Sequence, residues 1–248
     1  VGKEALSQFI RTECYRLLRL NLSPDVRAFQ AERMAAGMPP VQPARPGLEY
    51  LAQAGDEWQA EKIADLSNTF GVSLVVGDRY TTPVGDERFR EINLIDHILT
   101  APVGSFLVEA QFEVGAAFEH ALGIGDYRHI YGLVYARLRP DLIELLPASV
   151  GLDRCVSPGG VVSWLPPNDT RVRLRIVDIK LTAEPSPSYF AEVTYYAMAL
   201  AGWLIDRGLD DRYVVVPNAA IWPGSHDASC LVRTCREIED QGGTPTYG

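Results

Sequence analysis

Two short motifs in this chain carry the residue types that metal-assisted hydrolysis of a phosphodiester requires. Pro140 and Asp141 form the first motif, and Asp178, Ile179 and Lys180 form the second. Two carboxylates can hold a divalent ion, and a lysine beside them can orient and help to activate the attacking water. The sequence therefore predicts Asp141 and Asp178 as catalytic metal ligands and Lys180 as the catalytic lysine.

The second motif ends a segment that predicts a β-strand. Along residues 171–181 the even-numbered positions share one strand face, which begins with Val172, Leu174 and Ile176 and continues with Asp178 and Lys180. An unpaired buried charge costs about 3–5 kcal/mol, so these two charges need each other or a metal. A purely structural Asp178–Lys180 pair is the alternative to a catalytic site.

The odd-numbered positions of the same segment form a basic stripe. Arg171, Arg173 and Arg175 share the face opposite the apolar residues, and we expect that face to be exposed to solvent. The stripe can contact a phosphate backbone, or it can simply be a solvated strand face.

Asp141 needs a strand partner to join Asp178. The chain runs from Asp141 directly into the apolar residues 142–146, which predict a strand. If that strand is a neighbour of the Asp178 strand, both carboxylates meet at one end of the sheet, as a Mg²⁺ or Mn²⁺ site requires. Alternatively, the Pro140-Asp141 step belongs to an ordinary turn.

The helix expected after Lys180 adds a polar pair. Glu192 and Tyr196 lie four residues apart and therefore share one helix face, from which they can reach a substrate backbone. In the alternative reading, Glu192 is solvated and Tyr196 lies at the edge of the core.

Helices, a run of strands, a helix and a last strand follow one another, which predicts an α/β domain with a mixed sheet. We expect helices at residues 4–22, 48–69 (interrupted or tightened near Gly55 and ended by Gly71), 92–99 and 186–208. Strands are expected at 73–76, 105–114, 127–138, 142–146 and 213–216, with a long hairpin connection at 157–169. One domain is expected over residues 1–240, with a helical N-terminal part, and a linker or tail over residues 241–248.

The composition is that of a globular protein, since 47% of the 248 residues are hydrophobic and 22% are charged. The formal net charge of −9 argues against a protein that coats nucleic acid, although it leaves room for a local basic groove. No apolar stretch is long enough to span a membrane, and the first residues carry no signal-peptide pattern. A cytoplasmic protein without a membrane partner is expected.

Together the motifs resemble those of a known family. Pro140-Asp141, Asp178-Ile179-Lys180 and the helical pair Glu192 and Tyr196 are similar to the motifs of the PD-(D/E)XK nucleases, in particular the RecB-like and CRISPR-adaptation exonuclease branch. The opening residues 6–16 resemble the N-terminal helix of that branch. The family has glutamine where this chain has Glu192, and the extra negative charge puts a DNA contact there in doubt.

The resemblance implies a restriction-endonuclease-like core, in which a central mixed β-sheet is flanked by helices. It also implies that Asp141 and Asp178 hold Mg²⁺ or Mn²⁺, that Lys180 is catalytic, and that Glu192 and Tyr196 bind substrate. A further metal ligand on an early helix is implied as well, for which Glu57 is the first candidate and Glu61 the second. Solvated helix carboxylates are the alternative for both.

Four cysteines raise the question of an iron–sulfur cluster. They are Cys14, Cys155, Cys230 and Cys235, and their spacing lacks one of the three C-terminal cysteines that cluster-bearing members of the branch have. Free or buried thiols are therefore expected instead of a cluster. A redox or cluster-bearing regulatory domain is the alternative.

These observations lead to one expected function and one main alternative. We expect a metal-dependent deoxyribonuclease that hydrolyses DNA phosphodiester bonds, as a module of a larger DNA-processing or defence system with a helicase or another subunit as partner. The alternative is a catalytically inactive nuclease-fold module that binds DNA or serves as a scaffold.

Overall fold

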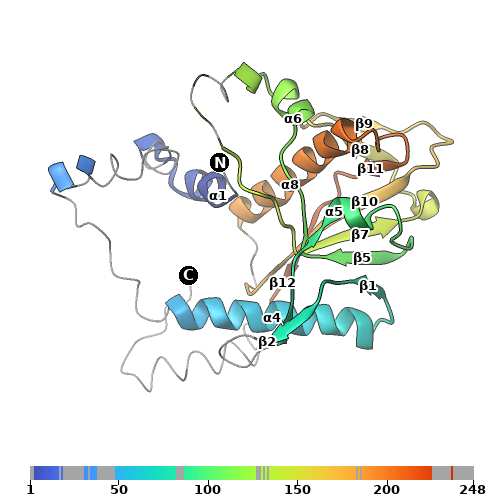
Figure 1. Cartoon of the computed structure of the whole chain (residues 1–248), viewed down its shortest axis with the longest axis horizontal. Helices are drawn as coiled ribbons and strands as arrows, with labels where there is room; N and C mark the ends of the chain where they lie inside the picture. Colours follow the sequence, from blue (N-terminus) through green and yellow to red (C-terminus); the bar gives the residue numbers. More distant parts are fainter. Residues whose placement is uncertain are drawn as a thin grey trace.

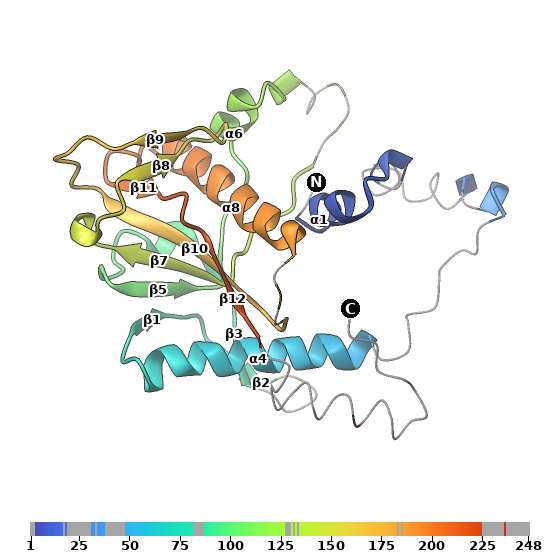
Figure 2. The same cartoon turned by 180° about the vertical axis from the view of Figure 1, so that it is seen from behind.

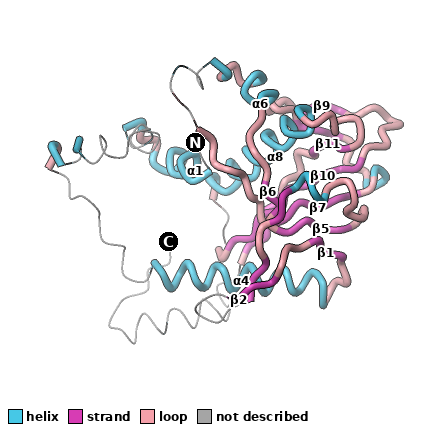
Figure 3. The backbone as a smooth tube through the Cα atoms, viewed as in Figure 1, coloured by secondary structure: helices cyan, strands magenta, loops and turns pink. Residues whose placement is uncertain are grey.

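The chain folds as a mixed α/β structure in which helices cover both faces of a central mixed sheet (Figures 1 and 3). This architecture confirms the predicted fold class at that level. In the computed structural model the described residues are 3–16, 18, 31, 32, 34–37, 48–81, 87–126, 130, 132, 134–182, 184, 186–224 and 236.

The central sheet has six strands in the order β1-β5-β7-β10-β11, with β12 also paired to β10. Its strands are β1 (Ser73–Val75), β5 (Ser105–Val108), β7 (Leu142–Leu146), β10 (Val172–Lys180), β11 (Tyr213–Val215) and β12 (Ala220–Pro223). The central strand β7 is antiparallel to both β5 and β10, whereas β1 runs parallel to β5. Both β11 and β12 run parallel to β10, β11 beside its first residues and β12 beside its last.

Helix α4 (Leu48–Asn68) covers one face of the sheet (Figure 2). Its apolar stripe includes Ala54, Trp58 and Ile63, which pack in one cluster with Val177 and Ile179 of β10. Of the two alternatives expected near Gly55, interruption or tightening, the interruption is not found, because the helix runs unbroken through this residue. A single helical glycine costs only about 1 kcal/mol, which the packing of its neighbours can offset.

Helix α8 (Pro187–Asp206) covers the opposite face. Its extent agrees with the helix predicted over 186–208 from the proline at its start and the glycine at its end. Pro187 occupies the first turn, and Gly208 follows the helix with a φ of 62°, a left-handed conformation that favours glycine. The helix buries a long apolar stripe against Leu174 and Ile176 of β10. Helices α1 (Lys3–Thr12) and α6 (Ala116–Ala121) contact α8 in turn.

Short elements connect these layers. They are the antiparallel pair β2 (Arg79–Thr81) and β3 (Glu87–Phe89), the parallel pair β4 (Ile92–Asn93) and β6 (Ala110–Gln111), helix α5 (Leu94–His97), the 3₁₀ helix η1 (Ala148–Val150), and the antiparallel pair β8 (Arg154–Val156) and β9 (Val162–Trp164). No helix in the described part of the chain has both the length and the apolarity to cross a bilayer.

Several predicted elements differ in extent or type. The strand predicted over 105–114 ends at Val108, with β6 at Ala110–Gln111, and the helix predicted over 92–99 spans Leu94–His97.

The helix predicted over 4–22 is interrupted after Thr12, where Glu13 adopts a left-handed φ of 49°. Residues 15, 16 and 18 are helical again, and residues 17 and 19–22 lie outside the described part of the chain. The predicted strand over 127–138 is not formed where the structure describes it: Ile130 is helical, and only Leu138 makes a β-bridge, to Phe112. Gly132, with a φ of 61°, interrupts the extended run that the sequence favours.

The basic stripe is not a solvated face, which corrects the prediction for β10. Arg173 is buried, with only 2% of its side chain exposed, and its guanidinium lies 2.6 Å from Asp169. Arg171 pairs with the same carboxylate at 2.6 Å, and Arg175 donates to Glu144 of β7 at 2.6 Å. These arginines stabilise the start of β10 because each has a carboxylate partner within the protein.

The Asp169 pair yields a prediction on stability. Hydrogen bonds from Arg171, and then from Arg173, lower the pKa of the buried Asp169 carboxyl from 3.8 to about 2. Since the pKa is lower in the folded state, the stabilisation is complete above about pH 4 and is lost as the pH falls toward about 2. We expect Asp169→Asn to reduce the free energy of unfolding by about 3 kcal/mol at neutral pH, because Arg173 stays buried without its counter-charge.

Chemical denaturation of both proteins over a pH series measures this difference, which should shrink below about pH 4. Asp65→Asn is the matched control: it breaks the half-exposed Lys62–Asp65 pair and should cost no more than about 0.5 kcal/mol. Equal costs for the two variants, or a difference that does not change with pH, would contradict the prediction.

Candidate active site

The register between β7 and β10 brings the two motif carboxylates to one end of the sheet. Leu142 is paired with Val177, so the next step along the register places Asp141 opposite Asp178. The backbone N–H of Ile179 donates a hydrogen bond to Asp141 Oδ2 at 2.6 Å. The expectation that these two strands are neighbours is confirmed.

Asp178 is a buried carboxylate with an incomplete set of partners. It is fully buried, with 0% exposure, and within the described residues neither of its oxygens accepts a hydrogen bond. Lys180 Nζ lies 2.6 Å from Asp178 Oδ2 as an ion pair, without hydrogen-bond geometry. A buried carboxylate normally needs several donors or a cation, so Asp178 has ligand capacity to spare.

Lys180 lies between β10 and α8. Besides Asp178, its ammonium lies 3.5 Å from Glu192 Oε2 and 5.4 Å from the centre of the Tyr189 ring. Both α8 residues come from the first turns of that helix, which packs against β10. The lysine is thus held by two carboxylates and an aromatic face, with 20% of its side chain still exposed.

Tyr196 is a buried phenol close to the charged groups. Its hydroxyl donates a hydrogen bond to the carbonyl of Arg139 at 3.2 Å. Burial raises the pKa of Tyr196 well above its ordinary value, and the negative charges of Asp178 and Asp141 raise it further. The neutral phenol therefore fixes the chain just before Pro140 and Asp141, while its predicted contact with substrate stays a prediction.

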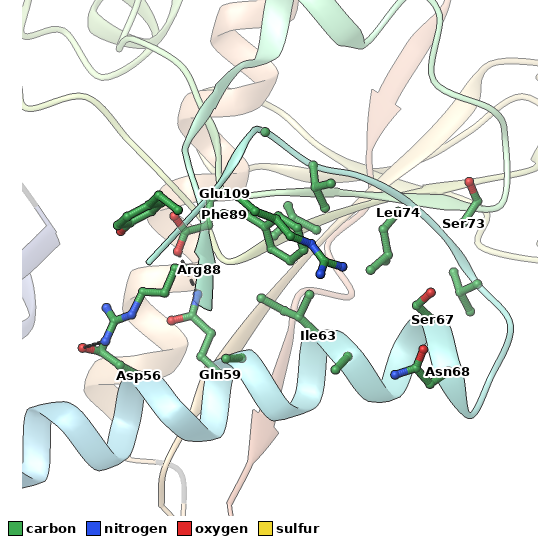
Figure 4. A pocket seen from close by; sticks show the side chains of 18 of the residues that line it. Asp56, Gln59, Ile63, Ser67, Asn68, Ser73, Leu74, Arg88, Phe89 and Glu109 are labelled. Carbon is green, nitrogen blue, oxygen red and sulfur yellow. Dashed lines mark hydrogen bonds and ion pairs between the residues drawn. The ribbon is translucent and has the colours of Figure 1, made fainter. Parts of the chain in front are cut away.

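Two residues of the site, Gln59 and Glu109, were missed by the sequence reasoning. Gln59 of α4 donates through Nε2 to Glu109 Oε1 at 3.0 Å (Figure 4). The same amide donates to Asp141 Oδ1 at 3.3 Å, so it joins two carboxylates. The Glu109 N–H donates to the carbonyl of Asp141 at 2.9 Å. The sequence pattern that could have pointed to Glu109 is a charged residue directly after the buried strand β5. Asp178 likewise follows apolar residues, near the end of β10.

Glu109 also has an unusual backbone. Its φ of 49° lies in the left-handed region, which non-glycine residues rarely adopt. Strained residues of this kind cluster at functional sites. The strain aims a third carboxylate at the same end of the sheet as Asp141.

Glu57 and Glu61 lie elsewhere on α4. Glu57 Oε1 accepts a hydrogen bond from Gln53 at 3.2 Å, and Glu61 Oε1 lies 3.1 Å from Lys62 Nζ. Gln59, Asp141 and Lys180 line the cavity of about 510 Å³ over the site. Glu57, Glu61 and the fully buried Asp178 do not line it. The contacts with Gln53 and Lys62 are with neighbours on α4, and a metal-binding role for Glu57 or Glu61 stays a prediction.

The donor chemistry of the site fits a hard divalent cation. Asp141, Asp178 and Glu109 offer carboxylate oxygens, and those of Asp178 accept no hydrogen bond from the described part of the chain. Among the described residues, no three His, Cys, Asp or Glu side chains form a ready-made metal cage. An ion held by one or two carboxylates takes its other ligands from water and substrate phosphates, as Mg²⁺ usually does.

The cysteines do not form a cluster within the described residues. Cys14 and Cys155 are free thiols, and Cys155 Sγ lies 3.3 Å from Ser163 Oγ. Cys230 and Cys235 lie outside the described residues, so a cluster that includes them is untested.

Comparisons of the chain with protein-family models, with curated proteins and with solved structures gave no match. The resemblance to the PD-(D/E)XK nucleases therefore stays a prediction.

Metal binding can be tested apart from catalysis. We expect about 5 mM MnCl₂ to raise the melting temperature of the protein by about 5 °C, because a ligand that binds only the folded state stabilises it. Asp178→Asn should abolish the shift, and Glu109→Gln should reduce it. Glu57→Gln, a matched loss of one carboxylate from α4, should keep the full shift.

Differential scanning fluorimetry measures these shifts. A full shift in Asp178→Asn would show that the ion binds elsewhere. Loss of the rise in melting temperature in Glu57→Gln would show that Glu57 contributes to metal binding.

Proposed function

We propose that this chain is a metal-dependent nuclease of the PD-(D/E)XK type that hydrolyses DNA phosphodiester bonds. The observation that carries the proposal is the fully buried Asp178 carboxylate, which accepts no hydrogen bond within the described residues and lies opposite Asp141 with Lys180 beside it. A charge pair kept only for stability would have its remaining oxygen satisfied by protein donors. The spare ligand capacity of Asp178 favours a cation site.

The proposal extends to a restriction-endonuclease-like core. Strands β5, β7 and β10 form a continuous run of the sheet, with α4 on one face and α8 on the other. The acidic motifs lie at adjacent ends of β7 and β10, and the lysine ends β10. This order of helix, strands and helix supports the assignment.

Each group has a distinct task in the proposed mechanism. When bound, the divalent cation acts as a Lewis acid and lowers the pKa of the attacking water. Asp141 is oriented for metal binding by the Ile179 N–H and the Gln59 amide. The Lys180 ammonium donates a hydrogen bond to the attacking water and counters the charge that develops on the phosphate in the transition state. Tyr196 holds the Arg139 carbonyl and so positions the neighbouring Asp141.

Cleavage assays on linear duplex and single-stranded DNA with Mn²⁺ test the mechanism. We expect Asp178→Asn and Lys180→Met to lower kcat by about 10²–10³-fold, the effect of removing a group that stabilises transition-state charge. Lys62→Met, which removes a lysine ion-paired on α4, is the matched control and should retain wild-type activity. Unchanged cleavage in either site variant would remove the proposed mechanism.

A DNA-binding or scaffold module without catalytic activity is the second candidate, and Glu192 is the observation that favours it. This glutamate is buried, and its carboxylate lies 3.5 Å from Lys180 Nζ. It therefore draws the lysine toward α8 and adds negative charge where a phosphate would bind.

Glu192→Gln separates the two candidates. For an active nuclease we expect the KM for DNA to fall about fivefold, because roughly 1 kcal/mol of like-charge repulsion is removed. Steady-state cleavage kinetics measure this change, and Glu61→Gln serves as the control for losing a carboxylate from the surface. DNA binding without cleavage, in both the wild type and Glu192→Gln, would favour the scaffold module.

A further inference from the structure

A second cavity lies between α4 and the β2–β3 hairpin, next to the candidate site (Figure 4). Its volume is about 740 Å³, within the range of about 300–1,000 Å³ that is usual for ligand sites. It shares Gln59, Glu109 and Arg139 with the cavity over Asp141 and Lys180. A ligand in the second cavity can therefore continue directly into the candidate site.

The lining combines apolar and aromatic surface. Ile63 of α4 and Leu74 of β1 supply aliphatic surface, and Tyr80 and Phe89 of the hairpin supply aromatic rings. In Figure 4, Phe89 and Ile63 approach the cavity from opposite sides. Such a surface suits the flat faces of a nucleic-acid base.

The charge of the lining suits an anion. Three arginines line the cavity, Arg79, Arg88 and Arg139, against two carboxylates, Asp56 and Glu109. The lining is therefore net positive, although the whole chain has a formal net charge of −9. Arg88 is paired with Asp56 at 2.7 Å. Arg139 lies 3.6 Å from Glu109 and 3.8 Å from Glu91. The excess positive charge of the lining therefore comes from Arg79. A local basic surface in an acidic protein favours a phosphate-bearing ligand.

The hairpin presents each aromatic ring together with a guanidinium group. Arg79 is paired with Phe89 in the strand register and lies 5.3 Å from its ring centre. Arg90 lies 5.6 Å from the ring centre of Tyr80, which is 38% exposed. Unpaired bases stack on aromatic rings and on guanidinium planes, while arginines contact the phosphates.

Gly77 fixes the base of the hairpin over the cavity. A Cβ atom at this position would lie 2.2 Å from the carbonyl oxygen of Arg90, so only glycine allows the two segments to approach so closely. This close approach joins the segment before β2 to the segment after β3 at the edge of the cavity.

We propose that this cavity binds an unpaired nucleotide of the DNA strand whose adjacent phosphate lies at Asp141 and Asp178. The inference rests on the proposed nuclease function and adds the substrate class, which is single-stranded or frayed DNA. A base in a duplex is stacked and paired, and it must leave the stack before it can enter a space between a helix and a hairpin. An unpaired base enters at lower cost.

Binding of a fluorescent oligothymidylate of about ten nucleotides, followed by fluorescence polarisation in EDTA, tests the inference without any cleavage. We expect the wild type to bind this strand about tenfold more tightly than a blunt duplex hairpin. Tyr80→Ala should raise the Kd for the single strand about tenfold. Arg79→Gln should reduce the slope of log Kd against log salt by about 0.7, the value for one lost phosphate contact.

The β8–β9 hairpin offers matched controls. Arg154 and Trp164 are register partners with the guanidinium 5.7 Å from the ring centre, and this hairpin lies away from α4 in both views (Figures 1 and 2). Arg154→Gln and Trp164→Ala should leave the Kd unchanged. If Tyr80→Ala fails to unfold cooperatively, Tyr80→Leu keeps the apolar bulk without the aromatic face, and the same tenfold rise is expected.

Each outcome decides the inference. Three results would overturn it. The first is an equal loss of affinity for the single strand in the variants of both hairpins, the second is an unchanged Kd in the Tyr80 and Arg79 variants, and the third is an equal Kd for single strand and duplex. Cleavage with Mn²⁺ is scored separately. Binding of the single strand through Tyr80 without any DNA cleavage would support the binding cavity and contradict the nuclease function. Cleavage that does not depend on Tyr80 would support the nuclease function and contradict the binding cavity.

Discussion

The antiparallel register between β7 and β10 determines where the charged groups of the candidate site lie. Because side chains alternate across a strand, a slip of one residue would send Asp178 and Lys180 toward α4 and leave Asp141 opposite an apolar residue. The register is secured at both ends of β10. Arg175 donates to Glu144 across the strand pair, and the Ile179 N–H donates to Asp141. The ion pairs of Asp169 fix the start of the strand.

Burial of the charged side chains destabilises the folded state, but it also strengthens the electrostatic interactions that these side chains make. Asp178 is taken fully out of water at the end of a face that is otherwise apolar, with Lys180 as its close counter-charge. Inside a protein the effective dielectric constant is lower than in water, so each charge acts more strongly on a neighbouring phosphate or ion. Lys180 is shared with Glu192, and the balance between those two carboxylates sets how far the ammonium reaches into the cavity.

Local patterns predicted the elements that carry the motifs. Strand β7 matches the predicted residues 142–146, and α8 follows from Pro187 and Gly208, because alternation, proline and glycine act over a few residues. The contribution of Gln59 could not be predicted in this way, because it depends on how α4 crosses the sheet. Arg173 was misjudged for a similar reason: its partner Asp169 precedes the strand, and alternation alone assigned the side chain to solvent.

The left-handed backbone conformation of Glu109 affects which substitutions this position tolerates. A left-handed conformation costs a residue with a side chain about 1 kcal/mol or more, and glycine would adopt it without that penalty. A glycine here would relax the main chain but would remove one of the two carboxylates to which the Gln59 amide donates. At this position, therefore, the relaxed main chain that glycine allows and the carboxylate contacts to Gln59 and Arg139 exclude each other.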